Sequence, residues 1–152
     1  MNGYMFDTNI FNRILDGQVE IDSWADKAQF FVTHIQWDEL NATRNLSRKG
    51  KLIRVFQTIA PSNVPTESSV LDVSRLDMAK LGVEDNLYEK VKRDLDAMKR
   101  KPNNCQDALI AETAIMNGFT LVTDDKDLLQ VTQSHAGAAK SFSGFIEELG
   151  EE

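Results

Sequence analysis

The amino-acid sequence predicts an α/β fold in which a parallel β-sheet is covered by helices on both faces. Short apolar segments alternate along the chain with longer segments in which apolar residues recur every three or four positions. The short segments are apolar throughout, as expected for strands that are buried on both faces. The 152 residues suit one domain, which at this size buries about 70% of the surface of the unfolded chain. We therefore expect a single three-layer α/β/α domain over residues 1–152 with a five-stranded parallel sheet.

The first third of the chain predicts two strands, each followed by a helix. Residues 1–6 are apolar and lead into a turn-forming segment, after which helical spacing begins. Residues 29–32 predict a second buried strand. Thr33 and Gln36 then form a capping-box pattern, which predicts a helix over residues 34–46.

The rest of the chain continues the alternation of helices and strands. Pro61 and Pro102 interrupt helical patterns, and Gly118 suits the end of a helix. In chain order we expect a helix over 52–59, a strand over 69–73, helices over 85–101 and 107–117, a strand over 119–123, a short helix from 124, a strand over 139–142 and a final helix through 149.

The composition excludes several classes of protein. With 17 Lys and Arg against 24 Asp and Glu, the chain does not hold nucleic acid by bulk positive charge, but it can still be an enzyme whose acids gather around a cation. No apolar run is longer than four residues, whereas a membrane helix needs about 18, so we expect no membrane association. The single Cys105 cannot form an internal disulfide, which fits a reducing cytoplasm.

The acidic residues are informative through their positions. Asp7 follows the first predicted strand, and Asp124 and Asp125 follow a later one. Glu39 lies in the second turn of the helix after the second strand, and Asp107 in the first turn of the helix that leads into the later strand. In a parallel sheet with right-handed crossovers, all of these positions fall at the carboxyl edge. Open α/β sheets bind their ligands at this edge.

Carboxylates gathered at one edge predict a metal site. Two of them about 4 Å apart repel each other by about 4 kcal/mol at an effective dielectric constant of about 20. A cluster therefore needs a cation or raised pKa values. Oxygen donors without Cys or His partners favour Mg²⁺ or Mn²⁺ over zinc. Such an ion can activate a water molecule for attack on a phosphodiester.

Each acid also has a structural interpretation. Asp7 can cap the helix that follows it, and Asp107 can be a favourable first-turn acid. We interpret Asp124 and Asp127 as a helix N-cap and its partner. We interpret Glu112 as a surface acid, because it lies off the helical face of Asp107. Capping explains any single acid more easily than it explains the joint arrangement.

The segments that carry these acids form a set of four motifs. They are Phe6-Asp7-Thr8-Asn9-Ile10, Glu39-Leu40, Asp107-Ala108-Leu109-Ile110-Ala111 and Thr123-Asp124-Asp125. In order and spacing these motifs resemble the PIN-domain nuclease family, most closely its VapC-like toxin branch. The resemblance implies a five-stranded parallel sheet and Mg²⁺- or Mn²⁺-dependent cleavage of RNA. It also implies homodimers and, in the toxin branch, a small antitoxin that blocks the site.

The same resemblance implies a role for each residue of the site. Asp7 and Asp107 would be the main metal ligands, and Glu39 and Asp125 would complete the site or position water. Asp125 matches the Thr-x-Asp spacing of the family, with the adjacent Asp124 as the alternative fourth acid. The residues implied to hold these carboxylates in place are Thr8, Asn9 and Thr123.

Together these features predict a metal-dependent endoribonuclease that is the toxin of a type II toxin–antitoxin pair. One alternative is another phosphoryl-transfer hydrolase, such as a phosphatase, although Asp7 is not part of an Asp-x-Asp motif. The other alternative is a non-catalytic PIN-like module that binds RNA or a protein. Uncompensated buried carboxylates argue against such a module, since they cost stability without a cation.

One segment after the Glu39 helix supplies positive charge for holding RNA. Its basic residues are Arg44, Arg48, Lys49, Lys51 and Arg54. We hypothesise that this segment contacts the RNA backbone. The alternative is a solvated connection between two helices. A second basic run, residues 99–101, is placed to flank the site just before Asp107.

Overall fold

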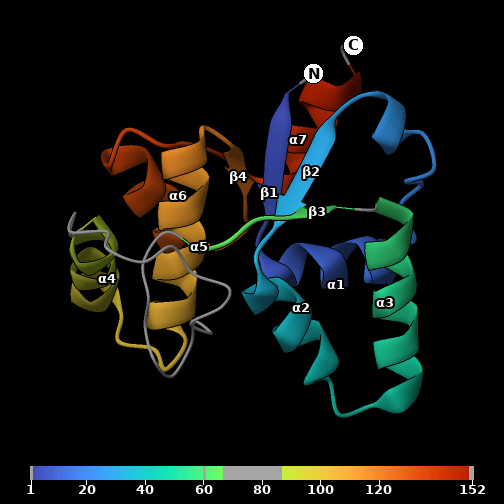
Figure 1. Cartoon of the computed structure of the whole chain (residues 1–152), viewed down its shortest axis with the longest axis horizontal. Coiled ribbons are helices and arrows are strands. Elements are labelled where there is room, and N and C mark those ends of the chain that lie inside the picture. Colours follow the sequence, from blue (N-terminus) through green and yellow to red (C-terminus); the bar gives the residue numbers. More distant parts are fainter. Residues whose placement is uncertain (1, 60, 67–86, 151–152) are drawn as a thin grey trace.

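The computed structural model describes residues 2–59, 61–66 and 87–150 (Figure 1). The strands are β1 (Gly3–Phe6), β2 (Gln29–Val32), β3 (Ser62–Asn63), β4 (Thr120–Val122) and β5 (Ala138–Lys140). The helices are α1 (Thr8–Gly17), α2 (His34–Asn41), α3 (Leu46–Ile59), α4 (Leu87–Met98), α5 (Asn104–Asn117), α6 (Lys126–Ser134) and α7 (Phe142–Gly150), with a 3-10 turn at Trp24–Asp26. Among these residues no helix has the length and apolar character needed to cross a membrane.

The strands form one parallel sheet in the order β3-β2-β1-β4-β5, with β1 in the middle. Met5 of β1 lies opposite Phe31 of β2 on one side and Leu121 of β4 on the other. The chain builds β2 and β3 on one side of β1 and β4 and β5 on the other. The strand order therefore reverses between β1 and β4, and open α/β sheets bind ligands at such a point.

Helices cover both faces of the sheet, which confirms the predicted three-layer α/β/α fold (Figure 1). Because successive strand residues point to opposite faces, Tyr4 and Phe6 enter one core while Met5 enters another. The first core packs the sheet against α1, α3 and α7, and in it Trp24 meets Phe145 edge-on with ring centroids 5.2 Å apart. The second core packs the sheet against α4, α5 and α6.

The helix predicted over residues 34–46 is two helices. The first, α2, ends at Asn41, and α3 begins at Leu46. The Asn45 side chain accepts a hydrogen bond from the backbone N–H of Arg48 at 3.1 Å, which caps the new helix. The prediction was wrong at this point because the helical spacing of apolar residues runs on without a break. That spacing does not show that the Asn45 side chain caps a second helix.

One predicted strand also differs from the observed one. The strand predicted over 139–142 is β5, which ends at Lys140, because the backbone N–H of Phe142 donates to Asp124 Oδ1 at 3.0 Å where α7 begins. The strand predicted over 69–73 lies outside the described residues. The third strand along the described chain, β3, has two exposed polar residues and pairs with β2 at the edge of the sheet. Its sequence carries no apolar pattern that predicts a strand.

Candidate acidic site at the carboxyl edge of the sheet

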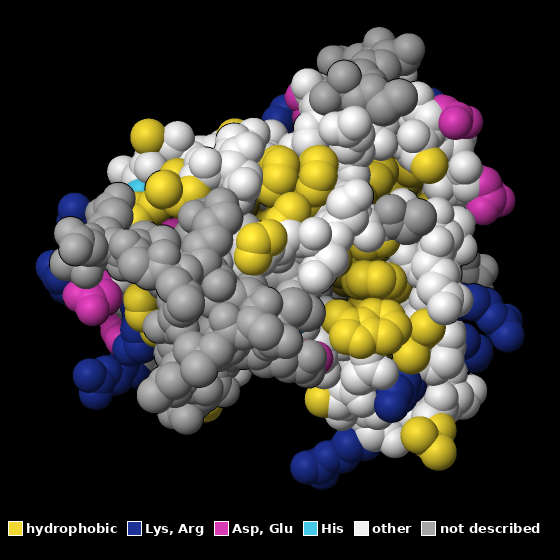
Figure 2. Space-filling view, in the orientation of Figure 1, with side chains coloured by type: hydrophobic (Ala, Val, Ile, Leu, Met, Phe, Trp, Pro, Cys, Tyr) yellow, Lys and Arg dark blue, Asp and Glu magenta, His cyan; other side chains and the backbone are white. Residues whose placement is uncertain are grey.

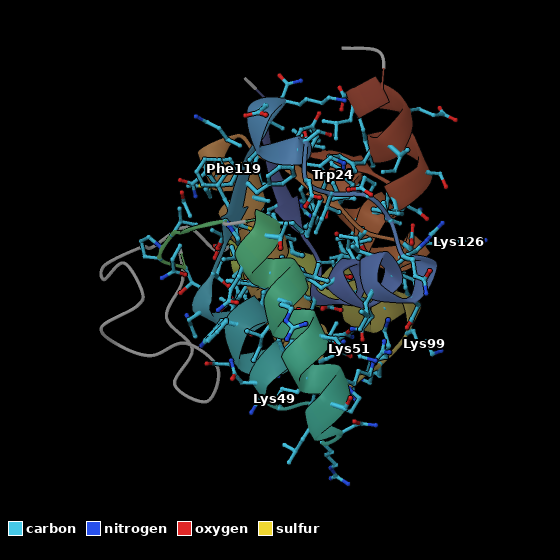
Figure 3. The ribbon with its side chains drawn as sticks, turned by 90° about the vertical axis from the view of Figure 1, so that its right-hand side faces the viewer. Trp24, Lys49, Lys51, Lys99, Phe119 and Lys126 are labelled. Carbon is cyan, nitrogen blue, oxygen red and sulfur yellow. The ribbon has the colours of Figure 1, made fainter. Side chains whose placement is uncertain are left out.

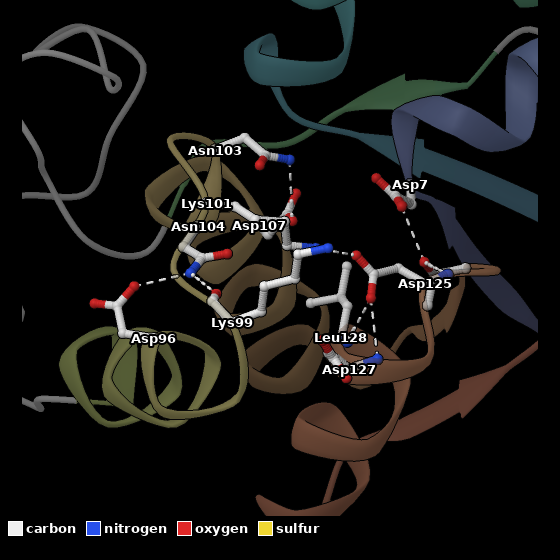
Figure 4. Close-up of polar contacts among 11 residues, drawn as sticks. Asp7, Asp96, Lys99, Lys101, Asn103, Asn104, Asp107, Asp125, Asp127 and Leu128 are labelled. Atoms are coloured by element: carbon white, nitrogen blue, oxygen red, sulfur yellow. Dashed lines mark hydrogen bonds and ion pairs between the residues drawn. The ribbon is translucent and has the colours of Figure 1, made fainter.

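The four predicted acids come from different elements and lie around the carboxyl edge of the sheet. Asp7 follows β1, Asp125 lies beyond the end of the neighbouring β4, Glu39 lies on α2 and Asp107 lies in the first turn of α5. Figure 4 shows three of them, Asp7, Asp107 and Asp125, around one region. The charges of Asp7, Glu39 and Asp125 all raise the pKa of Asp107. The fold thus brings all four carboxylates within electrostatic reach of one another.

Asp107 has a strongly raised pKa. Its side chain is buried, with 6% of the residue exposed. Burial and the negative charges of its neighbours raise its pKa to about 8, although Lys101 opposes them. Asn103 Nδ2 donates to Asp107 Oδ2 at 3.3 Å. At neutral pH and without a metal ion this carboxyl group is therefore mostly protonated.

Asp7 is held by the residue that follows the neighbouring strand. Thr123 Oγ1 donates to Asp7 Oδ2 at 2.9 Å, and both residues are buried. Asp7 occupies the N-cap position of α1, but its side chain makes no capping hydrogen bond there. Burial raises the pKa of Asp7, the hydrogen bond from Thr123 partly offsets the rise, and the charge of Asp125 adds to it. The capping interpretation of Asp7 therefore does not account for its side chain.

Glu39 is held by the first residue of α1. Thr8 Oγ1 donates to Glu39 Oε1 at 2.8 Å, across 31 positions of sequence. Partial burial raises the pKa of Glu39 and the charge of Asp7 raises it further, against the hydrogen bond from Thr8. Asn9, in contrast, is exposed and lines a surface pocket with Arg13. Thr8 and Thr123 thus donate hydrogen bonds to the acids, as expected, whereas Asn9 lies on the surface beside Arg13.

Asp125 differs from the other three acids because both of its oxygens are engaged. Oδ1 accepts from the backbone N–H groups of Asp127 at 3.0 Å and Leu128 at 3.2 Å, and so caps α6. Oδ2 pairs with Lys101 Nζ at 2.8 Å. Burial disfavours the charge on Asp125, but Lys101 and the two backbone groups outweigh it and hold its pKa below the usual range. Asp125 is therefore ionised, and Lys101 and the two backbone N–H groups compensate its negative charge.

Asp124 serves the neighbouring helices. Its Oδ1 accepts from Phe142 at the start of α7, and its Oδ2 pairs with Arg13 of α1. The Arg13 guanidinium also lies over the Phe142 ring, 5.1 Å from its centroid. The interpretation of Asp124 as the N-cap of the following helix is wrong, because the chain turns so that Asp125 takes that position.

Glu112 is not a surface acid, contrary to the interpretation from its helical position. Only 1% of the residue is exposed, and Glu112 Oε2 accepts from the backbone N–H of Tyr88 at 3.1 Å. It lies where α5 packs against α4, a contact that the sequence of α5 alone does not reveal.

Asn103 and Asn104, where the loop between α4 and α5 leads into α5, are residues that the sequence did not assign to the site. Lys101 in that loop belongs to the basic run that was expected to flank the site. Buried Asn104 donates through Nδ2 to Asp96 Oδ1 at 2.8 Å and to the backbone carbonyl of Lys99 at 2.9 Å, which fixes the loop. Asn103 reaches Asp107 from the same loop, and Lys101 reaches Asp125. The Pro102-Asn103-Asn104 run directly before Asp107 was the signal that could have identified this loop.

The chemistry of the donor set fits a hard divalent cation. In the part of the chain that the structure describes, no three His, Cys, Asp or Glu side chains lie close enough together to bind one ion as they stand. Each acid is instead turned toward its own hydrogen-bond partner. The donors are nevertheless all carboxylate oxygens, and the pKa values of Asp7, Glu39 and Asp107 are all raised. A cluster with this excess of negative charge binds a cation favourably.

The basic segment after α2 is only partly free to bind RNA. Arg48 makes a two-pronged ion pair with Asp16, at 2.8 and 3.1 Å, and donates to Asn12, so it ties α3 to α1. Figure 2 shows Lys and Arg side chains over the lower right of the molecule, where α2 and α3 lie, and Figure 3 shows Lys49 and Lys51 on α3. The members of the segment that are exposed are Arg44, Lys51 and Arg54.

The strand order reverses between β1 and β4, and carboxylates lie at the carboxyl edge there. These features define the class of protein, which is an α/β protein with a candidate acidic site. The sequence profile of the PIN domain matches residues 4–133 of this chain. The chain therefore belongs to the PIN domain family, as its motifs indicated. A comparison with curated proteins finds no significant match.

Solved structures of related fold cover nearly the whole chain. PAE2754 from Pyrobaculum aerophilum is 16% identical with a TM-score of 0.61, and the match covers 99% of this chain and 97% of that one. VapBC-1 from nontypeable Haemophilus influenzae is 18% identical with a TM-score of 0.54, covering 93% and 98%. FitAcB from Neisseria gonorrhoeae is 16% identical with a TM-score of 0.51, covering 90% and 95%. At these identities the likeness is one of fold.

Proposed function

We propose that this chain is a metal-dependent endoribonuclease that hydrolyses RNA phosphodiester bonds and acts as the toxin of a type II toxin–antitoxin pair. The observation that carries this proposal is the set of raised pKa values of Asp7, Glu39 and Asp107 at the ligand-binding edge of the sheet. The single positive charge of Lys101 offsets only part of the negative charge of such a cluster, and a divalent cation supplies the rest. Membership of the PIN domain family supports the nuclease activity.

The proposed roles follow from the contacts of each acid. Asp7, Glu39 and Asp107 would hold Mg²⁺ or Mn²⁺, which when bound supplies an activated water and stabilises charge at the phosphate. Thr123 fixes one oxygen of Asp7, and Thr8 fixes one oxygen of Glu39. These hydroxyl groups therefore set the direction in which the carboxylates face. Asp125 anchors the start of α6 beside them.

A cleavage assay on mixed cellular RNA tests the proposal. We expect cleavage in Mg²⁺ or Mn²⁺, and no cleavage in EDTA. Asp22→Asn is a matched control for variants of the site acids, because Asp22 is exposed and does not belong to the cluster. Intact RNA after incubation with metal-bound, partner-free protein would reject the nuclease in favour of a binding module.

Thr123→Val is expected to lower the cleavage rate by about ten- to a hundredfold while the protein stays folded. The substitution keeps the shape of a fully buried side chain but removes the hydrogen bond that the hydroxyl donates to Asp7, together with the one it accepts from the backbone N–H of Asp125. Thr132→Val is the matched control, since the buried Thr132 hydroxyl donates only within α6, to Leu128. Equal rates for the two variants, measured under saturating Mn²⁺, would show that the Asp7 contact does not matter for activity.

The exposed basic residues of α3 are the part of the predicted RNA-binding segment best suited to a test. Changing Lys51 and Arg54 together to Gln is expected to weaken RNA binding and to reduce the slope of log K against log salt by about 1.4, as for two contacts to single-stranded RNA. Arg48 is left unchanged because it holds α1. A double change of Lys27 and Lys90 to Gln, at exposed positions outside the segment, is the control. Equal slopes in the two variants would remove α3 from the RNA interface.

The proposed context includes a protein partner. VapBC-1 and FitAcB share the fold of this chain, which supports an antitoxin partner. The proposal also includes a homodimeric toxin in the cytoplasm. Light scattering of the purified chain, with and without the product of an adjacent short reading frame, measures both associations. A monomer that does not bind that product would argue against the toxin context and leave the nuclease proposal intact.

A further inference from the structure

Lys101 places a positive charge inside the acidic site. It reaches across from the loop between α4 and α5, and its ammonium lies 2.8 Å from Asp125 Oδ2 at the start of α6 (Figure 4). The lysine side chain is 26% exposed and that of Asp125 is 25% exposed, so the pair is largely shielded from solvent. The positive charge also opposes the rise in the pKa values of Asp7 and Asp107, which burial causes. Lys101 therefore acts on three of the four acids, Asp7, Asp107 and Asp125.

The contacts of Asp125 show how Lys101 affects metal binding at this carboxylate. Asp125 Oδ1 caps α6 through two backbone N–H groups, and Oδ2 holds Lys101. A carboxylate oxygen has two lone pairs, and the Lys101 ammonium takes one of those on Oδ2. A divalent cation that approaches the other lone pair is repelled by the positive charge of Lys101.

The backbone around Lys101 is fixed, which makes the contact a built feature of the site. Asn104, with 1% exposure, ties the loop to Asp96 and to the carbonyl of Lys99. The side chain of Lys99, two residues away, is exposed. The loop therefore presents one lysine to the acids and the other to solvent.

We propose that Lys101 is a resident cation of the acidic site, which occupies Asp125 and competes with a divalent ion for that carboxylate. The inference rests on the proposed metal dependence of the site. It assigns to Asp7, Glu39 and Asp107 the main part in holding the ion. It also makes Lys101 the residue that sets how tightly the site binds metal.

Calorimetric titration of the full chain with Mn²⁺ alone, without RNA, tests this role. Lys101→Met keeps the apolar stem and removes the charge, and we expect it to tighten Mn²⁺ binding about three- to tenfold. Lys99→Met removes the same charge from the same loop without touching Asp125, and we expect it to change the affinity less than about twofold. Lys101→Arg keeps the charge and is expected to bind Mn²⁺ like the unchanged protein. Thermal melting of each variant confirms that it is folded, as the remaining cap of α6 on Asp125 leads us to expect.

The possible results separate this inference from the function on which it rests. If Lys101→Met binds Mn²⁺ no more tightly than Lys99→Met, Lys101 is a structural tether and the proposal is wrong, while metal binding by the site stands. If it binds more weakly, Lys101 assists the ion, and the proposal is equally wrong. If the unchanged protein and every variant fail to bind Mn²⁺ at millimolar concentration, the metal-dependent function fails, and this inference fails with it.

Discussion

Asp107→Asn is expected to abolish RNA cleavage and, at the same time, to raise the stability of the metal-free protein. The asparagine keeps the size of the side chain and still accepts a hydrogen bond from Asn103. It removes a buried carboxyl group whose pKa is about 8 because of burial and the charges of Asp7, Glu39 and Asp125. At pH 8 in EDTA we expect the melting temperature to rise by about 3–6 °C.

The same variant is expected to lose activity by about a hundredfold or more, because it lacks one of the proposed ligands. Carboxylates that repel one another without a metal ion but bind the ion jointly give this result, in which the variant gains stability and loses activity. Asp22→Asn, which removes an exposed acid outside the cluster, should leave both the melting temperature and the rate unchanged. A less stable Asp107→Asn protein would mean that favourable contacts hold the carboxylate in the absence of metal, and that repulsion within the cluster does not dominate.

Mn²⁺ is expected to stabilise the protein, and more strongly at alkaline than at acidic pH. The folded-state pKa of Asp107, about 8, lies above its ordinary value of 3.8, so folding favours the protonated form. The stability that this group contributes is therefore fully present below about pH 4 and is lost progressively as the pH rises from there to about 8. An ion binds the deprotonated carboxylate, so its affinity grows over the same interval.

At pH 8.5 and a hundredfold excess of Mn²⁺ over its dissociation constant, we expect the melting temperature to rise by about 5–10 °C. The same Mn²⁺ concentration at pH 6 should give a clearly smaller rise. Asp107→Asn serves as the control, since without this titrating group the difference between the two pH values should shrink. A shift that is equal at both pH values would place the ion away from Asp107.

The positions of the acids could be predicted because they depend on where strands end and helices begin. Asp7 and Asp107 needed only the apolar segments beside them and the rule that parallel strands share a carboxyl edge. The choice between Asp124 and Asp125 could not be made that way. Both follow β4 directly, and the chain turns so that one caps α6 and the other meets α7.

Thr8 and Thr123 were expected to hold the carboxylates, but which acid each partner contacts could not be predicted, because the partners come from distant parts of the chain. Thr8 and Glu39 are 31 positions apart, and Lys101 and Asp125 are 24 apart. The basic run at residues 99–101 was visible in the sequence, but a helical pattern does not show which lysine turns inward. β3 was missed for a different reason, since its two polar residues are held only by pairing with β2.

The central claim is that these acids together form a cation site, and a Mn²⁺ titration of the unchanged protein beside Asp107→Asn at pH 8 tests it most directly. Asp22→Asn is titrated with them to correct for the loss of one negative charge. We predict that the unchanged protein and Asp22→Asn bind Mn²⁺, and that Asp107→Asn binds it at least about tenfold more weakly. Equal affinity for all three proteins, or no binding by the unchanged protein at millimolar Mn²⁺, would contradict the claim.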